Sequence, residues 1–508
     1  MKRMKHKKIL NILLTLSLII TSINIPVIHT LAKDDSSKKP IVLRVSNWEE
    51  YIDLGEWDED CEIELDNGAV IFGEQPLYKD FEDWYYENYG RKVIVEYSTS
   101  GTNEELYNLL TMGDVYDLIC PSEYMIMKLM TEGWLQPYSE SFYDTSVEEN
   151  YYARGVSPYI KKTMESNQIN GESWGKYAAC YMWGVTGMLY NSNVITESEV
   201  GTWKAYDNPK LYKQLTLKDN VRDTYFTALG IMKADKFMDP DFINSPDYHE
   251  SLASEMNDTS PETINKAENM LSDLVPRVYS METDSGKADL LSGKIAANYQ
   301  WSGDAAYILY EAGEDSGLKF AVPKECTNLW FDGWVMLKKG INGDSEKQHA
   351  AEAFVNFMSR PDNAVRNMEY IGYTSSISGG DDDTVYEYIK YRFEPEEDDV
   401  ETVQYPLGYF FSGNADDTDY IINADTGYAD GGELYAMYPT QDVMNRSVVM
   451  QYFDTDTNQE INQMWIHIRC KDIRDISIWT WFIAGGIALM LIAAFIVTKG
   501  IWKINRKK

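Results

Sequence analysis

An uninterrupted apolar run without any charged residue, Ile476 to Thr498, lies close to the C-terminal end of the 508-residue chain. At about 1.5 Å per helical residue, a run of this length can cross the roughly 30 Å hydrocarbon core of a bilayer. Five basic residues follow within segment 499–508, and basic flanks stay on the cytoplasmic side of a membrane. The sequence therefore predicts a transmembrane helix over 476–498, a cytoplasmic tail over 499–508, and a large body on the outer face of the cell membrane.

The N-terminal segment agrees with this orientation. Five basic residues precede an apolar stretch from Ile9 to Ile20, and Thr30-Leu31-Ala32 has the small residues of a signal-peptide cleavage site. We therefore expect a signal peptide over residues 1–32 and a polar spacer over 33–40. An uncleaved signal anchor is the alternative interpretation.

The body between these two segments is strongly acidic. The chain has a net charge of −35, and setting aside the five basic residues at each end leaves about −45. Such a field attracts cations and repels nucleic acid, although adaptation to solubility or salt could also explain it. Aromatic residues make up 13% of the chain, which excludes a disordered protein. The odd number and wide spacing of the five cysteines are not typical of a disulfide framework, although a single disulfide that the sequence does not assign stays an alternative. Cys120 is predicted as a buried thiol.

Strands and helices alternate in the first part of the body. Predicted strands cover Ile41–Val45, Lys92–Tyr97 and Tyr116–Cys120. Between them lie a helical stretch, Leu77–Tyr89, and a helix opened by the capping-box sequence Thr102–Glu105. This spacing predicts βαβ units and a largely parallel α/β sheet.

Aromatic and acidic side chains follow two of these strands. Trp48, Glu50 and Tyr51 come after the first strand, and Ser122 and Tyr124 come after the third. Ligands of open α/β sheets bind beyond the carboxyl ends of the strands. These loops are therefore the first candidate binding site.

The later part of the chain is predicted to cross between two lobes. The β-like stretch Tyr177–Tyr190 is broken by Gly184 and Gly187, and the strands Phe320–Pro323 and Leu329–Leu337 return toward the first lobe. Two further segments are predicted surface insertions: Gly55–Gly73 and the charge-rich Asp381–Asp399.

Five segments, in order, resemble the extracytoplasmic polyamine-binding proteins of ABC importers, the spermidine/putrescine receptors. They are Ser46–Tyr51 (SNWEEY), Asp117–Tyr124 (DLICPSEY), Gln300–Gly303 (QWSG), Leu329–Asp332 (LWFD) and Tyr370–Tyr373 (YIGY). The stretch Ala353–Pro361 has a further counterpart in the family. The likeness extends from Ile41 to Tyr373 and is looser from Thr374 to Trp465.

The resemblance implies an α/β, two-lobed type II periplasmic-binding-protein fold whose hinge closes the lobes on a ligand. Segments 41–184 and 330–375 would form lobe 1. Segments 185–329 and 376–470 would form lobe 2 and the hinge-crossing C-terminal part.

The resemblance also implies a set of ligand-binding residues. The cleft would be lined by Trp48, Tyr51, Ser122, Tyr124, Trp301, Trp330 and Tyr373, and ammonium groups would be taken by Glu50, Asp223 and Asp332. Two residues depart from the family pattern: Asn220 stands where such receptors often have a second carboxylate, and Asp223 is shorter than the usual Glu. Gln451 corresponds to a glutamine that lines the cleft of such receptors. Aromatic faces attract both methylene chains and ammonium groups, and carboxylates add charge-assisted hydrogen bonds, so this set suits a polyamine.

Other classes of protein have less support. His249, His349 and His467 show no metal-ligand spacing, no GxSxG elbow is present, and a carboxylate-dependent hydrolase stays the enzymatic alternative. The segment from Asp454 to Trp465 lacks the glycine and the final glutamate of a calcium loop. A protein of the same fold for a sugar or another organic cation is the nearer alternative. A sensor is a third one, which the short predicted cytoplasmic tail of about ten residues disfavours.

We therefore predict a membrane-tethered receptor that is not an enzyme. It would bind spermidine or putrescine and deliver it to ABC permease subunits driven by their cytoplasmic ATPase. No cofactor, metal site, catalytic residue or nucleic-acid partner is expected.

Overall fold

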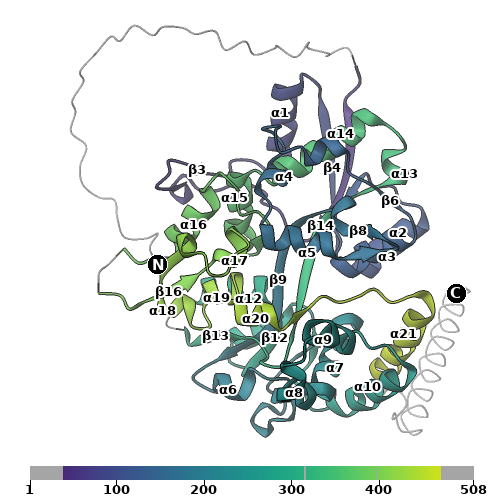
Figure 1. Ribbon diagram of the computed structural model, residues 1–508, viewed down its shortest axis with the longest axis vertical. Coiled ribbons are helices and arrows are strands. Elements are labelled where there is room, and N and C mark those ends of the chain that lie inside the picture. The colour runs from purple at the N-terminus through teal and green to yellow at the C-terminus, as the bar shows by residue number, and fades with distance from the viewer. Residues whose placement is uncertain (1–37, 314–315, 397–398, 471–508) are drawn as a thin grey trace, which may run out of the picture. The chain divides into compact units, whose positions relative to one another are not determined.

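The computed structural model describes residues 38–313, 316–396 and 399–470 (Figure 1). These residues divide into two compact units, one formed by the described parts of 38–258 and 278–454 and the other by 259–277 and 455–470. None of the helices in these ranges is both long and apolar enough to span a bilayer. The predicted signal peptide and the predicted transmembrane run 476–498 lie outside the described residues.

A mixed sheet organises the first unit. Its strands have the order β12-β9-β14-β5-β1-β4, in which β1 pairs in parallel with β4 and β5, while β14 and β9 are antiparallel to their neighbours. Figure 1 shows the two long strands, β9 and β14, running between the elements around β4 and those around α7. The bounds are β1 (Ile41–Trp48), β4 (Val93–Ser100), β5 (Leu118–Ile119), β9 (Ala178–Asn191), β12 (Ala297–Trp301) and β14 (Thr327–Leu337).

Helices cover this sheet and carry the loops that face its ends. Contacts join α1 to β4, α14 to β1, α3 to β14 and α12 to β9. The α/β architecture predicted from the alternating pattern is therefore confirmed. The helices that position the site are α1 (Leu77–Tyr89), α2 (Asn103–Met112), α3 (Glu123–Thr131), α7 (Val221–Phe237), α12 (Ser302–Ala312), α14 (Ser345–Met358) and α15 (Pro361–Ile371).

The sequence predicted the positions of helices α1 and α2 correctly. Helix α1 has the predicted bounds, and α2 begins after Thr102, whose hydroxyl accepts the Glu105 backbone N–H at 3.1 Å. The Glu105 carboxylate accepts the Gly101 N–H at 2.9 Å instead of the Thr102 N–H, so the return bond of the capping box forms one residue earlier than expected.

The glycines of β9 do not interrupt it, which corrects the prediction of a broken stretch. A Cβ atom on Gly184 would lie 2.6 Å from Cζ2 of Trp330, and one on Gly187 would lie 2.5 Å from Cζ of Phe320. These positions therefore lack a side chain because aromatic rings pack directly on the strand.

The two predicted surface insertions also contribute to the core. Segment Asp381–Asp399 contains α16 (Thr384–Phe393), which buries Val385, Tyr388, Ile389 and Phe393. Segment Gly55–Gly73 buries Ile63 and Ile71. The prediction was wrong because the many charges on the outer face hid the apolar spacing of the inner face. The prediction that Cys120 is buried is confirmed.

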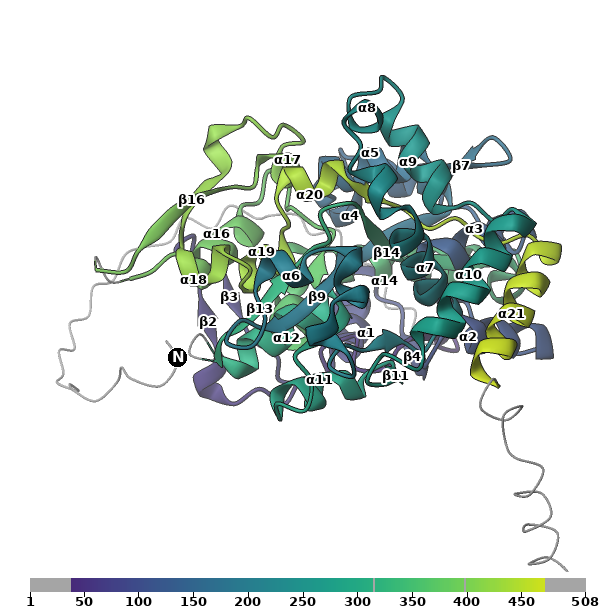
Figure 2. The ribbon, with the colours of Figure 1, turned by 90° about the horizontal axis from the view of Figure 1, so that it is seen from below.

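The second unit is a pair of helices, α10 (Pro261–Leu274) and α21 (Thr455–Arg469), which lie side by side in Figure 2. Glu268 of α10 meets Nδ1 of His467 of α21 at 2.9 Å. The helices bury apolar side chains at helical spacing: Ile264, Ala267, Leu271 and Leu274 on one, and Ile461, Met464 and Ile468 on the other.

Candidate functional site

A buried carboxylate, that of Asp332 on β14, lies beyond the ends of the parallel strands. The Tyr51 hydroxyl donates to its Oδ2 and the Ser122 hydroxyl donates to its Oδ1, each at 2.7 Å. The register of β14 shifts between Asp332 and Gly333, and Ser122 forms an isolated bridge with Asp332. Such irregularities redirect a side chain out of the regular sheet pattern. The loops after β1 and β5 are thereby brought together on one carboxylate, as the sequence predicted.

The surroundings of Asp332 make its negative charge costly. Burial raises the pKa of this carboxyl to about 6, although hydrogen bonds from Ser122, Tyr51 and Trp48 act in the opposite direction. In the described part of the chain, no lysine or arginine forms an ion pair with it. An incoming cation would therefore gain a strong electrostatic partner here.

A second buried carboxyl, Glu123 at the start of α3, lies next to the first. It is only 2% exposed and accepts the Phe331 backbone N–H at 3.1 Å. Burial and, to a smaller extent, the charge of Asp332 raise the pKa of Glu123 to about 8, although the hydrogen bond from Phe331 and the charge of Arg222 act in the opposite direction. Sequence reasoning missed this residue because isolated acids are usually solvated. Its position between Ser122 and Tyr124 was the signal that could have identified it.

Aromatic rings surround the Asp332 carboxylate. Tyr51 and Tyr373 meet edge to face with their centroids 5.0 Å apart, and Trp330 lies 5.7 Å from Tyr373. The Trp330 indole N–H donates to the Val185 carbonyl at 3.1 Å, which fixes the ring on β9. Tyr373 packs against Gly303, where a Cβ atom would lie 2.4 Å from the ring. We call Asp332, Glu123, Tyr51, Ser122, Trp330 and Tyr373 the Asp332 cluster.

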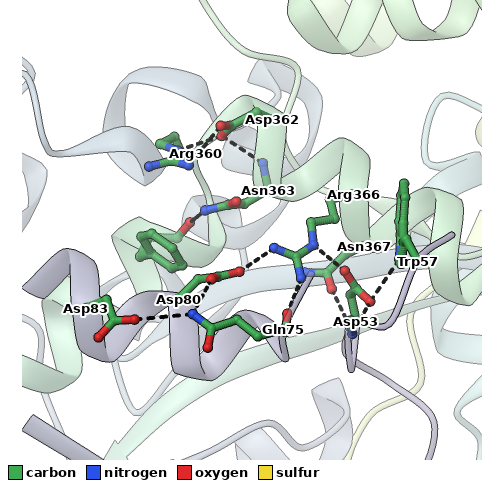
Figure 3. A network of polar contacts seen from close by, with 12 residues as sticks. Asp53, Trp57, Gln75, Asp80, Asp83, Arg360, Asp362, Asn363, Arg366 and Asn367 are labelled. Atoms are coloured by element: carbon green, nitrogen blue, oxygen red, sulfur yellow. Dashed lines mark hydrogen bonds and ion pairs between the residues drawn. The ribbon is translucent and has the colours of Figure 1, made fainter. Parts of the chain in front are cut away.

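A polar network, shown in Figure 3, connects the segments that follow Tyr51 and precede Tyr373. The Arg366 guanidinium of α15 forms ion pairs with Asp53 and Asp80, and the side chain of Arg366 is only 6% exposed. The Asp53 backbone N–H donates to the Asn367 side-chain oxygen at 2.9 Å. Asp53 follows Tyr51 by two residues, and α15 ends two residues before Tyr373. The network therefore fixes both segments through one helix.

A second group of predicted residues lies around Asp223, at the start of α7. Asn220 caps the helix by accepting the Asp223 N–H at 2.8 Å and donates its amide to the Asp223 carboxylate at 2.6 Å. Burial raises the pKa of Asp223, whereas hydrogen bonds from Asn220 and Trp301 and the charge of Lys218 lower it. Asn220 therefore positions this carboxylate.

Two buried cations accompany Asp223, and sequence reasoning identified neither. The Lys218 ammonium group lies 3.9 Å from the centroid of Trp301, and the Arg222 guanidinium lies 4.5 Å from that of Tyr124. Lys218 is 1% exposed and Arg222 is 6% exposed. A lysine in a two-residue strand gives no sequence signal of its contact with a tryptophan that lies 83 positions further along the chain.

Two of the predicted ligand-binding residues, Glu50 and Gln451, lie neither in the Asp332 cluster nor in the group around Asp223. Glu50 is exposed, with a φ of 52°, and its charge acts on Tyr370. The side chain of Gln451 is also exposed, and only its backbone is engaged, since its carbonyl accepts a hydrogen bond from Arg222.

Two pockets of about 380 Å³ each lie elsewhere on the first unit. One is lined by residues such as Tyr138, Tyr152 and Met164, and the other by residues such as Trp84 and Arg360. Neither contains a predicted ligand-binding residue, so the candidate site is defined by its buried charges and rings.

The α/β fold of this chain is that of periplasmic solute-binding proteins. A spermidine/putrescine ABC transporter substrate-binding protein from Streptococcus pneumoniae superposes with a TM-score of 0.53 at 22% identity, covering 84% of this chain and 98% of that one. At this level of identity, the likeness shows the fold.

The family follows from the sequence comparison. The model of the bacterial extracellular solute-binding protein family matches residues 77–388, which is more than half of the chain. The chain belongs to this family, which is a family of binding proteins and not of enzymes.

Two curated proteins are similar over much of their length. The spermidine/putrescine-binding periplasmic protein of Salmonella typhimurium is 28% identical over 287 residues, covering 56% of this chain and 70% of that protein. The putrescine-binding periplasmic protein of Escherichia coli is 24% identical over 301 residues, covering 56% and 71%.

Proposed function

We propose that this chain is an extracytoplasmic receptor that binds a polyamine at the Asp332 cluster and delivers it to an ABC importer. The observation that carries the proposal is the Asp332 carboxylate, which is buried among aromatic rings and has no cation of the described chain as an ion-pair partner. The names of the similar curated proteins support the same ligand class.

The chemistry of the cluster suits an alkyl ammonium group. Each aromatic contact with a cation contributes on the order of 0.5–2 kcal/mol, and a buried carboxylate adds a charge-assisted hydrogen bond. The hydroxyls of Tyr51 and Ser122 already orient the Asp332 oxygens, so the acceptor is arranged before the ligand arrives. The methylene chain of the ligand would lie against the rings of Trp330 and Tyr373.

Entry of the ligand requires the chain to open. Asp332 is 7% exposed and Asp223 is 6% exposed, so a solute reaches them only when the surrounding elements separate. We propose that the hinge lies in the long strands β9 and β14, with 41–184 and 330–375 as one lobe and 185–329 with 376–470 as the other part. Closure would then exclude water and strengthen each contact in the site.

We also propose a membrane tether and a transport partner for this receptor. The apolar run Ile476 to Thr498 would tether the receptor on the outer face, and permease subunits with their ATPase would take the ligand inward. Cell fractionation tests the tether, since the full chain should sediment with membranes and a chain ending at residue 475 should be released.

The ligand is tested by calorimetric titration of the full chain with putrescine, spermidine and maltose. We expect micromolar or tighter binding of a polyamine and no heat with the neutral disaccharide. Binding of the sugar alone, or no polyamine binding by folded, ligand-free protein, would refute the proposed function.

A further inference from the structure

Lys218 occupies the surroundings that a ligand ammonium group would seek. Its Nζ lies 3.9 Å from the centre of the Trp301 ring and donates to the Thr283 carbonyl at 2.8 Å and to the Gln300 side-chain oxygen. An aromatic face with converging carbonyl oxygens is a common way to hold an ammonium group. This end of the site is therefore already occupied by a cation of the chain itself.

The neighbouring aromatic face is occupied in the same way. The Arg222 guanidinium lies between the rings of Tyr124, at 4.5 Å, and Phe453, at 3.6 Å, and donates to the backbone carbonyl of Gln451. Two of the aromatic residues assigned to the ligand, Trp301 and Tyr124, thus already have cationic partners.

The distribution of charge divides the site into two unlike ends. The charges of Lys218 and Arg222 both act on Asp223. At the other end, Asp332 and Glu123 form no ion pair with any lysine or arginine of the described residues, although the charge of Arg222 also acts on Glu123, and each carboxyl has a raised pKa. Asp332 and Glu123 are therefore the carboxyl groups with which ligand ammonium groups would pair.

We propose that Lys218 is a specificity-determining residue of this site, which makes the site select a short diamine over a triamine. The inference rests on the proposed function and narrows its ligand class. A diamine of putrescine size would bind with its ammonium groups at Asp332 and Glu123 and would not extend to Lys218. The third ammonium group of spermidine would meet Lys218, and two like charges in a desolvated site repel strongly.

The test compares dissociation constants of putrescine and spermidine by calorimetry on the full-length protein and its variants. The wild type should bind putrescine at least about tenfold more tightly than spermidine. Lys218→Met keeps the apolar stem and removes the charge, so the preference should shrink by about tenfold or more as the third ammonium group takes the vacated position.

Two controls separate charge from general damage. Lys218→Arg retains the cation and should keep the preference for putrescine. Lys233→Met removes a cation of α7 that is bound instead to Glu255 and Asp258, and it should leave the ratio unchanged. Far-ultraviolet circular dichroism checks the folding of each variant, and Lys218→Gln replaces the Met variant if that one does not fold.

The measured affinities distinguish failure of the proposed role of Lys218 from failure of the proposed polyamine binding. A wild type that binds spermidine as tightly as putrescine, or an uncharged Lys218 variant with an unchanged ratio, would overturn it while leaving a polyamine receptor in place. Absence of binding by both polyamines to every form would instead refute the proposed function, and the inference with it.

Discussion

Replacing Asp332 by asparagine should remove ligand binding and at the same time stabilise the empty protein. The carboxyl of Asp332 is buried, and its pKa is raised from 3.8 to about 6. The asparagine side chain has nearly the same shape as aspartate, and hydroxyl groups rotate to serve as donor or acceptor, so Tyr51 and Ser122 keep a hydrogen-bond partner. The substitution therefore removes mainly the buried charge.

The magnitude follows from the pKa. At 1.36 kcal/mol per pKa unit, a rise from 3.8 to about 6 corresponds to about 3 kcal/mol of destabilisation of the charged form on folding. Because the folded state holds the proton more tightly than the unfolded state, this penalty is complete above pH 6 and absent below pH 3.8. Asp332→Asn should therefore raise the free energy of unfolding by up to about 3 kcal/mol at pH 8, and the gain should disappear near pH 4.

Two assays check the two halves of this prediction. Urea unfolding of ligand-free protein at pH 8 and pH 4 measures stability, and calorimetry at pH 8 measures polyamine affinity, which should fall by at least about a hundredfold because a charge-assisted bond and a Coulomb partner are lost. A variant that binds as tightly as the wild type, or that is less stable at pH 8, would refute the reasoning about the buried charge.

The remaining predictions concern the titration of the Asp332 cluster and the stability of the Arg366 network. Affinity for a polyamine should fall as the pH drops below about 6, where Asp332 becomes protonated. Binding between pH 6 and 8 should release protons from Glu123, and calorimetry in buffers of different ionisation enthalpy measures that release. Ser122→Ala removes a hydrogen bond that favours the charged form of Asp332, so the midpoint of this pH profile should move upward; an unchanged midpoint would contradict the assignment. Arg366→Met leaves the buried carboxylate of Asp53 without its ion-pair partner and should lower the free energy of unfolding by about 3–5 kcal/mol. Arg360→Met, at a partly exposed pair, should lower it by less than about 1 kcal/mol, and equal costs in chemical unfolding would contradict the role of the network.

Local patterns predicted local structure because the forces involved act over a few residues. The bounds of Leu77–Tyr89 and the cap at Thr102 were correct, since helix spacing and capping depend on neighbours along the chain. The same reasoning failed for Asp381–Asp399. Its charges are on the solvent side of a helix whose other side is buried, and only packing against α15 makes that visible.

The candidate site was predicted in part. The residues around Asp332 were found through motifs, and the structure brings Tyr51, Ser122, Trp330 and Tyr373 together with it. Glu50 was expected in the cleft because the resemblance assigns this motif position to the ligand, whereas Glu50 is exposed and has a left-handed backbone conformation. Cations contributed by the chain itself were not considered at all.

The sequence by itself determined the order of strands and helices, the acidic character of the body and the family to which the chain belongs, because periodicity, composition and motifs are properties of residues in order. Only the tertiary structure decided which charges are buried together. The raised pKa of Asp332 and the position of Lys218 over Trp301 arise from desolvation and from contacts between segments far apart in the chain, and these depend on distances in space.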